Sequence, residues 1–290
     1  SSDLGATSRI AVHTTVAVLA LLVLAATMET VSHDGRATAY RVRGDGHGTP
    51  ALFVHGSGGT HAVWKSQLAR LADDRRVAAL DLSGHGESDD VATEPGSATL
   101  DAYARDVQAV AREVEAGVLV GNSLGGAVAL TAVLDHGASP DAVVLAGSGA
   151  KLAVLEDLMD WLAGEDGGFD RAVEFLHGDD MLFHDPDDRE LAFSKTAMRE
   201  CGRAVVERDF ASCHRFDVRD RLGELDMPVF ALTGEHDRLT PPTFHEYVAE
   251  HVQDGGWTTV PDAAHLSMLE APERFNGEVA GFLDGLEVAR

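Results

Sequence analysis

Residues 121–126 read Gly-Asn-Ser-Leu-Gly-Gly, so one serine, Ser123, is surrounded by three glycines. The stretch follows the apolar residues 118–120 and precedes the apolar residues 127–130. Glycine lacks a Cβ and tolerates positive φ, so a glycine cluster marks a sharp turn or a close approach of the backbone. The pattern therefore predicts that a short buried strand turns abruptly into a helix and presents the Ser123 hydroxyl. Because short patterns recur by chance, an ordinary Gly-rich turn stays open until the surrounding chain is considered.

The segments around this turn alternate between short apolar runs and amphipathic runs. We predict strands over residues 38–43, 51–54, 76–81, 118–121, 142–146, 228–232 and 258–260, with a glycine-rich turn at 44–48. We predict helices over residues 62–71, 100–114, 124–134 and 272–288. Short continuous apolar strands that alternate with helices predict an α/β fold, in which helices cover both faces of a mostly parallel central sheet.

The alternation lapses between residues 151 and 225, where apolar side chains recur at helical spacing. A connection of this length between two strands is too long for a simple loop. We therefore predict a helical cap over residues 151–225, inserted into a core made of residues 28–150 and 226–290. Most apolar side chains of the cap would pack on one another, and a minority would line a pocket.

Charge sets limits on the partners of the chain. Its 290 residues carry 48 acidic and 23 basic side chains, a net charge of −25, and 29 of the acids are Asp. Such a surface repels nucleic acids and anionic membranes, so we expect a small-molecule substrate and no nucleic-acid partner. The Asp-rich, Lys-poor balance is similar to that of proteins from salt-loving microbes, whose internal salt screens the repulsion. We therefore expect stability to rise in molar KCl.

The first 27 residues differ in composition from the rest, because they contain one acid, Asp3, and the apolar run 16–26. Eleven apolar residues are too few to span a bilayer, although residues 10–28 reach the length with polar residues included. Arg9 before a short apolar core is similar to a signal peptide, but a clear A-x-A cleavage site is missing. The third interpretation, which we favour, is that the folded unit begins at Met28. Any membrane association would then depend on residues 1–27.

Two cysteines, Cys201 and Cys213, are too few for a disulfide framework and lack the paired spacing of a zinc site. We expect them to be small buried or cap residues of a protein in a reducing compartment, and hence a cytoplasmic location. Residues 1–27 leave secretion or membrane anchoring open.

A serine hydroxyl is a weak nucleophile that needs an adjacent base, itself oriented by a carboxylate. Two later strands supply candidates, because residues 228–233 run into Gly-Glu-His-Asp at 234–237, and residues 258–260 run into Pro-Asp-Ala-Ala-His at 261–265. Each candidate follows the C-terminal end of a strand, the edge at which open parallel sheets hold their sites. The base would be His265, and the carboxylate would be Asp237, Glu235 or Asp262.

Five stretches in order make the chain, from about Met28 onward, resemble the α/β-hydrolase family: His-Gly-Ser-Gly-Gly at 55–59, Asp-Leu-Ser-Gly-His-Gly-Glu-Ser at 81–88, the glycine-flanked serine, Gly-Glu-His-Asp at 234–237, and His265. The resemblance implies the family fold with a helical cap. It also implies Ser123 as the nucleophile, His265 as general base and then acid, and Asp237 as the carboxylate that orients His265. The family's acid follows glycine by three residues, which favours Asp237 over its two rivals.

Acyl transfer passes through an oxyanion that backbone N–H groups must stabilise. One donor should be Leu124, the residue after the nucleophile, and the resemblance implies Ser57 as the second, with Gly58 as the alternative. Gly58 and the cap residues Trp161 and Phe183 are candidate substrate contacts. No cofactor or metal is expected, since the acidic run at 184–188 lacks the glycine and terminal Glu of a calcium loop.

Relatives that open epoxides or displace halides carry Asp at the position of Ser123, so those reactions are not expected. We expect a serine hydrolase that cleaves small, mostly apolar carboxylic esters through an acyl-enzyme. A C–C bond hydrolase or an enol-lactonase is the alternative within the same chemistry. A non-catalytic ligand-binding protein on the same scaffold is the alternative from another class, because a fold alone does not establish a function.

Overall fold

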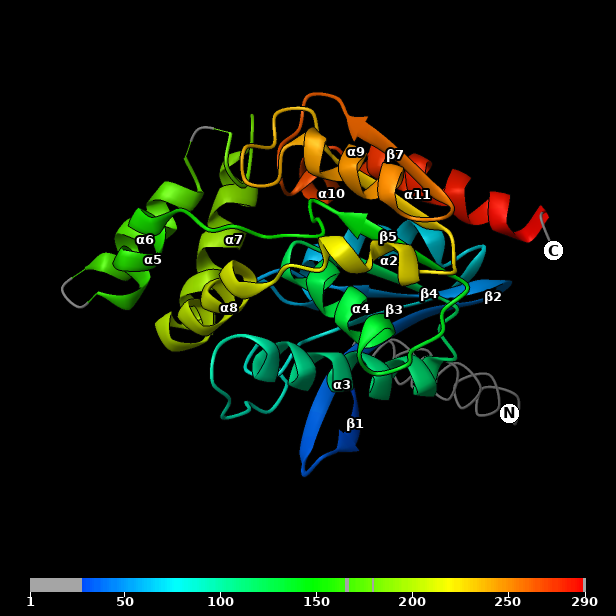
Figure 1. The fold of residues 1–290 in the computed structure, drawn as a ribbon, viewed down its shortest axis with the longest axis horizontal. Coiled ribbons are helices and arrows are strands. Elements are labelled where there is room, and N and C mark those ends of the chain that lie inside the picture. Colours follow the sequence, from blue (N-terminus) through cyan, green and yellow to red (C-terminus); the bar gives the residue numbers. More distant parts are fainter. Residues whose placement is uncertain (1–27, 165–166, 179, 289–290) are drawn as a thin grey trace, which may run out of the picture.

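The structure is a computed structural model that describes residues 28–164, 167–178 and 180–288 (Figure 1). The predictions made for residues 1–27 lie outside the described residues. Within the described part of the chain, no helix combines the length and the apolar character that crossing a bilayer requires.

Seven strands form one sheet, which confirms the predicted fold class. The order is β1-β2-β4-β5-β6-β7, with β3 paired to β2. The strands are β1 (Glu29–His33), β2 (Arg36–Val54), β3 (Arg75–Leu80), β4 (Val118–Asn122), β5 (Ala142–Ala146), β6 (Val229–Gly234) and β7 (Gly255–Val260). Strand β1 pairs antiparallel with β2, whereas β4, β5, β6 and β7 pair in parallel. The carboxyl ends of these four strands therefore meet at one edge of the sheet.

Strand β2 corrects one prediction. The predicted turn at residues 44–48 is present as a reversal of the chain, but these residues are the irregular middle of one long strand and do not separate two strands. Before them the partners in β3 fall from Leu80 to Val77, and after them the partners rise again from Val77 to Leu80. The two halves of β2 therefore run in opposite directions along β3. The register reverses because the chain bends back at its glycines, of which Gly44 has a φ of 75°.

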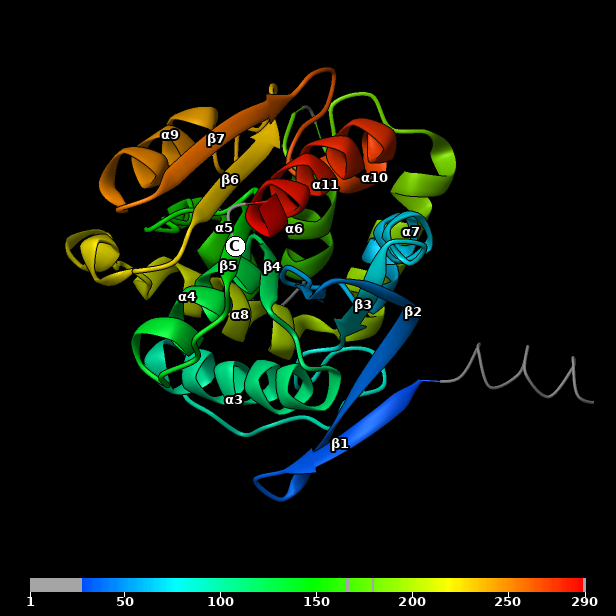
Figure 2. The ribbon, with the colours of Figure 1, turned by 90° about the vertical axis from the view of Figure 1, so that its right-hand side faces the viewer.

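Helices cover both faces of the sheet, as Figure 2 shows for α3 and α11 on opposite sides of β4. In β2, Leu52 and Val54 pack into the core on the α3, α4 and α9 side, whereas Ala51 and Phe53 pack into the core on the α2 and α11 side. This alternation is the side-chain period of a strand buried on both faces. The helices are η1 (His61–Trp64), α2 (Lys65–Leu71), α3 (Ser97–Val114), α4 (Leu124–Leu134), α9 (Pro242–His251), α10 (Ser267–Glu270) and α11 (Pro272–Val288).

Residues 151–225, which we call the cap insertion, leave the sheet after β5 and return before β6. They hold α5 (Glu156–Ala163), α6 (Gly168–Leu176), α7 (Asp188–Cys201), α8 (Arg203–Arg215) and η2 (Arg219–Glu224), and α5 to α8 gather at one end of the molecule (Figure 1). The entering and leaving chains pair at a neck, where Val218 N–H donates to Ala150 O at 2.8 Å. An ion pair of 3.2 Å between Lys151 Nζ and Asp217 Oδ2 lies beside it. The insertion thus begins and ends at one point of the sheet.

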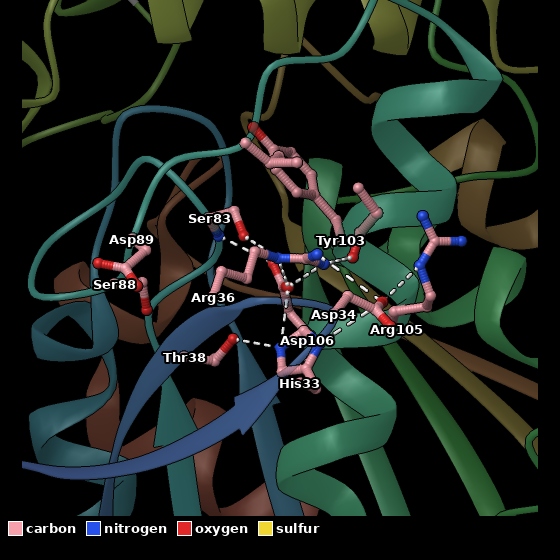
Figure 3. Close-up of polar contacts among 12 residues, drawn as sticks. His33, Asp34, Arg36, Thr38, Ser83, Ser88, Asp89, Tyr103, Arg105 and Asp106 are labelled. Carbon is pink, nitrogen blue, oxygen red and sulfur yellow. Dashed lines mark hydrogen bonds and ion pairs between the residues drawn. The ribbon is translucent and has the colours of Figure 1, made fainter.

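A buried polar cluster fastens the β1–β2 hairpin to α3, and we call His33, Arg36, Ser83 and Asp106 the hairpin network (Figure 3). Arg36 Nη2 and Nε donate to Asp106 Oδ1 at 2.7 and 3.0 Å. The other oxygen, Asp106 Oδ2, accepts from Ser83 N–H at 2.9 Å, and His33 Nε2 lies 3.3 Å from Oδ1. Asp106 is completely buried, so these partners compensate for the loss of water around its charge.

Candidate active site

Ser123 lies between the end of β4 and the start of α4, in a backbone conformation of φ 53° and ψ −117° that non-glycine residues rarely adopt. Gly121 and Gly125, on either side of Ser123, must be glycine because neighbouring backbone atoms lie very close to them. A Cβ on Gly121 would lie 2.3 Å from Gly125 O, and a Cβ on Gly125 would lie 2.3 Å from Val54 O. The strand, the turn and the helix can therefore pack this tightly only with glycine at both positions.

Two buried side chains support the turn from behind. Ser148 Oγ donates to the backbone oxygen of Ser123 at 2.8 Å, and Ser148 N–H donates to His245 Nε2 at 3.0 Å. Burial lowers the pKa of His245 to about 4, so its ring stays neutral at neutral pH and can accept this bond. The carbonyl side of Ser123 is thus held while its hydroxyl side faces the cavity described below.

Asp237 and His265 are in contact at the carboxyl edge of the sheet, beyond β6 and β7. Asp237 Oδ2 accepts from His265 Nδ1 at 2.9 Å. This bond places the ring proton on Nδ1 and leaves Nε2 as the basic nitrogen. Asp237 also accepts from Thr233 Oγ1 at 2.6 Å, and from the N–H and Oγ1 of Thr240 at 2.9 and 2.8 Å.

These donors keep Asp237 ionised although it is almost fully buried. Burial alone would raise the pKa of this carboxyl, but His265 and the surrounding hydrogen bonds outweigh burial and lower the pKa below its usual value. The two rival carboxylates, Glu235 and Asp262, are exposed. Of the three candidates, Asp237 is therefore the one that the structure brings to His265.

The expected oxyanion donors lie on the loop after β2 and at the first residue of α4. Among the described residues, none accepts a hydrogen bond from the N–H of Ser57 or of Leu124. His55 secures the loop, because its Nδ1 donates to Gly56 O at 2.7 Å and its Nε2 accepts from Leu82 N–H at 3.0 Å. Burial and the neighbouring His85 lower the pKa of His55 to about 4, so the ring is neutral and structural.

A cavity of about 290 Å³ lies between the carboxyl edge of the sheet and the cap insertion. Ser123, His265, Ser57 and Gly58 all line it, so the predicted nucleophile, base and oxyanion loop face one space. The rest of the lining is mostly apolar and comes largely from the cap insertion, the loop before α9 and the first turn of α9. It includes Leu152, Leu155, Leu158, Met181, Leu182, Phe193, Met198, Phe210, Leu239 and Phe244. An apolar cavity with a few convergent polar groups is the usual form of a small-molecule site.

Two predicted substrate contacts are wrong, because Trp161 and Phe183 do not line this cavity. Trp161 packs edge-on against Phe175 and carries the Arg171 guanidinium 4.2 Å from its ring centre. Phe183 is buried against the His177 ring. Both side chains therefore hold the cap together. The aromatic residues that reach the cavity instead are Phe193, Phe210 and Phe244, and helical spacing alone did not distinguish them.

Asp180, His184 and His236 form a group whose ligand atoms lie within 4.8 Å of one another. The rings of His184 and His236 stack with their centres 3.7 Å apart and their planes at 9°. A metal ion lies near the plane of each imidazole that binds it, so two rings stacked face to face cannot both bind one ion. His184 Nδ1 is instead 2.6 Å from Asp180 Oδ1, and this ion pair raises the pKa of His184.

Comparisons with known proteins agree with this architecture. A model of the alpha/beta hydrolase family matches residues 51–278. A pimeloyl-[acyl-carrier protein] methyl ester esterase from Neisseria meningitidis serogroup C is 28% identical over 81% of this chain and 93% of its own. The 3-oxoadipate enol-lactonase 1 of Acinetobacter baylyi is 26% identical over 88% of this chain and 96% of its own. The structure of a thermophilic esterase superposes with a TM-score of 0.77 at 28% identity, covering 90% of this chain and 98% of that one.

Proposed function

The chain belongs to the alpha/beta hydrolase family, and from this premise we propose that it is a serine hydrolase that cleaves small, mostly apolar carboxylic esters through an acyl-enzyme intermediate. One observation carries the proposal. The buried, ionised Asp237 binds His265 Nδ1, and the same histidine shares an apolar cavity with Ser123. A carboxylate, an imidazole and a hydroxyl in this relation are the parts that nucleophilic catalysis by serine needs.

In the proposed reaction His265 Nε2 takes the proton of the Ser123 hydroxyl as Oγ attacks the ester carbonyl. Asp237 stabilises the imidazolium that forms and keeps the ring in the correct tautomer. The N–H groups of Leu124 and Ser57 bind the oxyanion, and each such donor contributes about 3 kcal/mol to transition-state stabilisation. His265 then protonates the leaving alcohol, and water hydrolyses the acyl-enzyme by the same steps.

The cavity supports the choice of substrate. A volume of about 290 Å³ with a mostly apolar lining suits a short acyl chain or a small ring. Residues 151–225 act in this proposal as a cap that shapes the acyl pocket, since α5, α7 and α8 all contribute to the lining. An enol-lactone is a second candidate substrate, because the enol-lactonase of Acinetobacter baylyi matches most of this chain. Cleavage of a C–C bond would use the same nucleophile, so a substrate of that kind is the third candidate.

The direct test combines active-site labelling with a substrate panel. A fluorophosphonate probe should label the wild-type protein at Ser123 and leave Ser123→Ala unlabelled. Turnover of p-nitrophenyl butyrate should fall by about 10⁶-fold in Ser123→Ala, because the nucleophile is lost while the fold remains. A thioester, an enol-lactone and a vinylogous diketo acid assayed beside the ester would rank the substrate classes. A folded wild-type protein that neither reacts with the probe nor turns over any substrate would support the ligand-binding alternative.

We also propose that the protein works in the cytoplasm of a cell with high internal salt. The net charge of −25, the scarcity of Lys and the unpaired state of Cys201 and Cys213 support this environment. The salt dependence of stability, given in the Discussion, tests the proposal.

A further inference from the structure

Asp209 is a charged residue at a position where its helix is otherwise packed against the rest of the protein. Helix α8 buries Val205, Val206, Ser212 and Cys213 along one face, and Asp209 lies at the centre of that face with no exposed surface. A carboxylate is almost never fully buried unless it is paired and hydrogen-bonded. The partners of Asp209 therefore indicate why an acidic residue occupies this position.

Three segments of the hydrolase core meet at this one carboxylate, and we call Ser57, His85, Tyr103 and Asp209 the Asp209 network. Ser57 Oγ, on the loop after β2, donates to Oδ2 at 2.9 Å. Tyr103 OH, on α3, donates to Oδ1 at 2.7 Å. His85 Nε2, in the turn after β3, lies 3.0 Å from Oδ2. The network thus joins a cap helix to the loop that carries the expected second oxyanion donor.

The charges in the network are matched. Burial alone would lower the pKa of His85, but the Asp209 carboxylate outweighs it and raises the pKa well above the ordinary value. Burial raises the pKa of Tyr103, so its hydroxyl keeps the proton that it donates. Asp209 therefore faces two hydroxyl donors and, at 3.0 Å but without a hydrogen bond, the His85 ring, and the Ser57 hydroxyl is held by a charge-assisted bond, the stronger class of hydrogen bond.

The Ser57 side chain and its backbone N–H are joined at one Cα, so holding the hydroxyl also restrains the peptide. On one side of Ser57 the loop is secured by the bond from His55 to Gly56 O. On the other side Met198 of α7 packs against Gly58, where an added Cβ would lie 2.9 Å from Met198 Cγ. The direction in which the Ser57 N–H points then depends on the hydroxyl held by Asp209.

We propose that Asp209 is a positioning residue, which holds the Ser57 hydroxyl and thereby aims the Ser57 N–H at the oxyanion. The cap would then contribute to transition-state stabilisation as well as to the acyl pocket. The inference rests on the proposed function, because it assumes that an oxyanion forms beside Ser57.

The test compares two Ser→Ala variants that each remove one hydrogen bond between α8 and the core. Ser57→Ala removes the bond to Asp209. Ser212→Ala removes the bond that Ser212 Oγ accepts from Gly96 N–H at 2.9 Å, far from the loop in sequence and on the same helix. With p-nitrophenyl butyrate, kcat should fall by about tenfold in Ser57→Ala, because complete loss of an oxyanion donor costs about 10²- to 10³-fold. KM should stay within about twofold, since the oxyanion exists only in the transition state.

Ser212→Ala should lower the thermal midpoint but leave kcat within about twofold, and Ser57→Thr, which keeps a hydroxyl, should recover most of the lost kcat. An alkyl boronic acid, whose tetrahedral adduct with Ser123 imitates the oxyanion, should bind Ser57→Ala about tenfold more weakly. Asp209→Asn, where one oxygen must serve both hydroxyls, should lower kcat in the same way. Adding Ser57→Ala to it should then cost less than about threefold, because coupled residues are not additive.

Equal kcat values in wild type and Ser57→Ala, or equal losses in Ser57→Ala and Ser212→Ala, would overturn the inference. Full additivity of Ser57→Ala and Asp209→Asn would overturn it too. If Asp209→Asn does not fold, the comparison of the two serine variants decides alone. A wild-type protein that the fluorophosphonate probe does not label would instead contradict the proposed function, and the inference with it.

Discussion

Two buried carboxylates, Asp237 and Asp106, have similar partners but different surroundings. Asp237 binds the His265 ring at 2.9 Å, and Asp106 binds the Arg36 guanidinium at 2.7 Å. The histidine side of the first pair opens onto the cavity, because His265 lines it. The second pair, in the hairpin network, is closed by Ser83 and His33, and none of these four residues belongs to the cavity lining.

The comparison shows how to tell a catalytic from a structural buried charge. A carboxylate next to a cavity can orient a group that changes its protonation state during a reaction. A carboxylate surrounded by donors that keep their protons takes no part in proton transfer. Its partners only offset the cost of burying its charge. Variants at the first site should therefore affect turnover more than stability, and variants at the second site should do the reverse.

The largest effect is expected at Asp237, whose partner His265 lines the cavity. Asp237→Asn should lower kcat about 10⁴-fold, because an amide in this position favours the wrong tautomer of His265. Steady-state kinetics on p-nitrophenyl butyrate would measure the loss, and fluorophosphonate labelling would slow in parallel.

Asp262→Asn is the matched control, since Asp262 is exposed and belongs to the loop that carries His265. Its kcat should stay within about twofold of wild type. A large loss in Asp262→Asn together with an active Asp237→Asn would mean that the carboxylate has been assigned to the wrong loop.

A smaller effect, on stability, is expected at Asp106, which lies away from the cavity. Asp106→Asn should lower the free energy of unfolding by about 3 kcal/mol, because Arg36 would lose its buried counter-charge and keep only the more distant, exposed Asp34, at 3.7 Å. Urea unfolding would measure the change, and kcat of the folded variant should stay within about twofold. Asp34→Asn removes an exposed carboxylate that lies 2.9 Å from Arg105 and 3.7 Å from Arg36 and His33, and it should cost no more than about 0.5 kcal/mol, because water screens these longer and exposed pairs. Equal costs at Asp34 and Asp106 would remove the distinction between buried and exposed pairs.

The smallest effect is expected from the exposed acidic residues, which belong to neither of the two buried pairs. Raising KCl from 0.1 M to 2 M should stabilise the wild-type protein by about 1 kcal/mol, or roughly 2 °C in thermal midpoint, because salt screens the repulsion among exposed acids. Buried pairs are screened much less, so the deficit of Asp106→Asn should persist in high salt. A midpoint that stays flat or falls as KCl rises would argue against adaptation to salt.

Local patterns in the sequence were enough to predict the parts of the site that lie at strand ends. The glycines around Ser123 reflect contacts within a few residues, and Asp237 follows Gly234 by a short, fixed step. Helices α4 and α11 and strand β5 have the predicted bounds, because their apolar runs end at clear turn or cap signals. In each case the determining interactions are close in the chain.

Contacts between distant segments could not be predicted in this way. Ser57 and Asp209 are separated by 152 positions, and nothing near either residue indicates the other. Helical spacing identified the cap helices but did not show which aromatic side chains face the cavity, so Trp161 was chosen where Phe210 lines it. The turn at residues 44–48 was predicted, but its continuity with the strand segments on either side was not, because a glycine-rich stretch has the same composition in a loop and in an irregular strand.

The neck of the cap insertion has a consequence for the history of this protein. Residues 150 and 218, which lie on either side of helices α5 to α8, are hydrogen-bonded to each other, so the span between them can change in length or sequence without moving β5 relative to β6. Recombination at these two points would exchange one acyl-binding module for another while leaving the chemical machinery in place. A lineage could thus acquire new substrates by grafting, provided that each graft rebuilt the contact between Ser57 and its partner on α8.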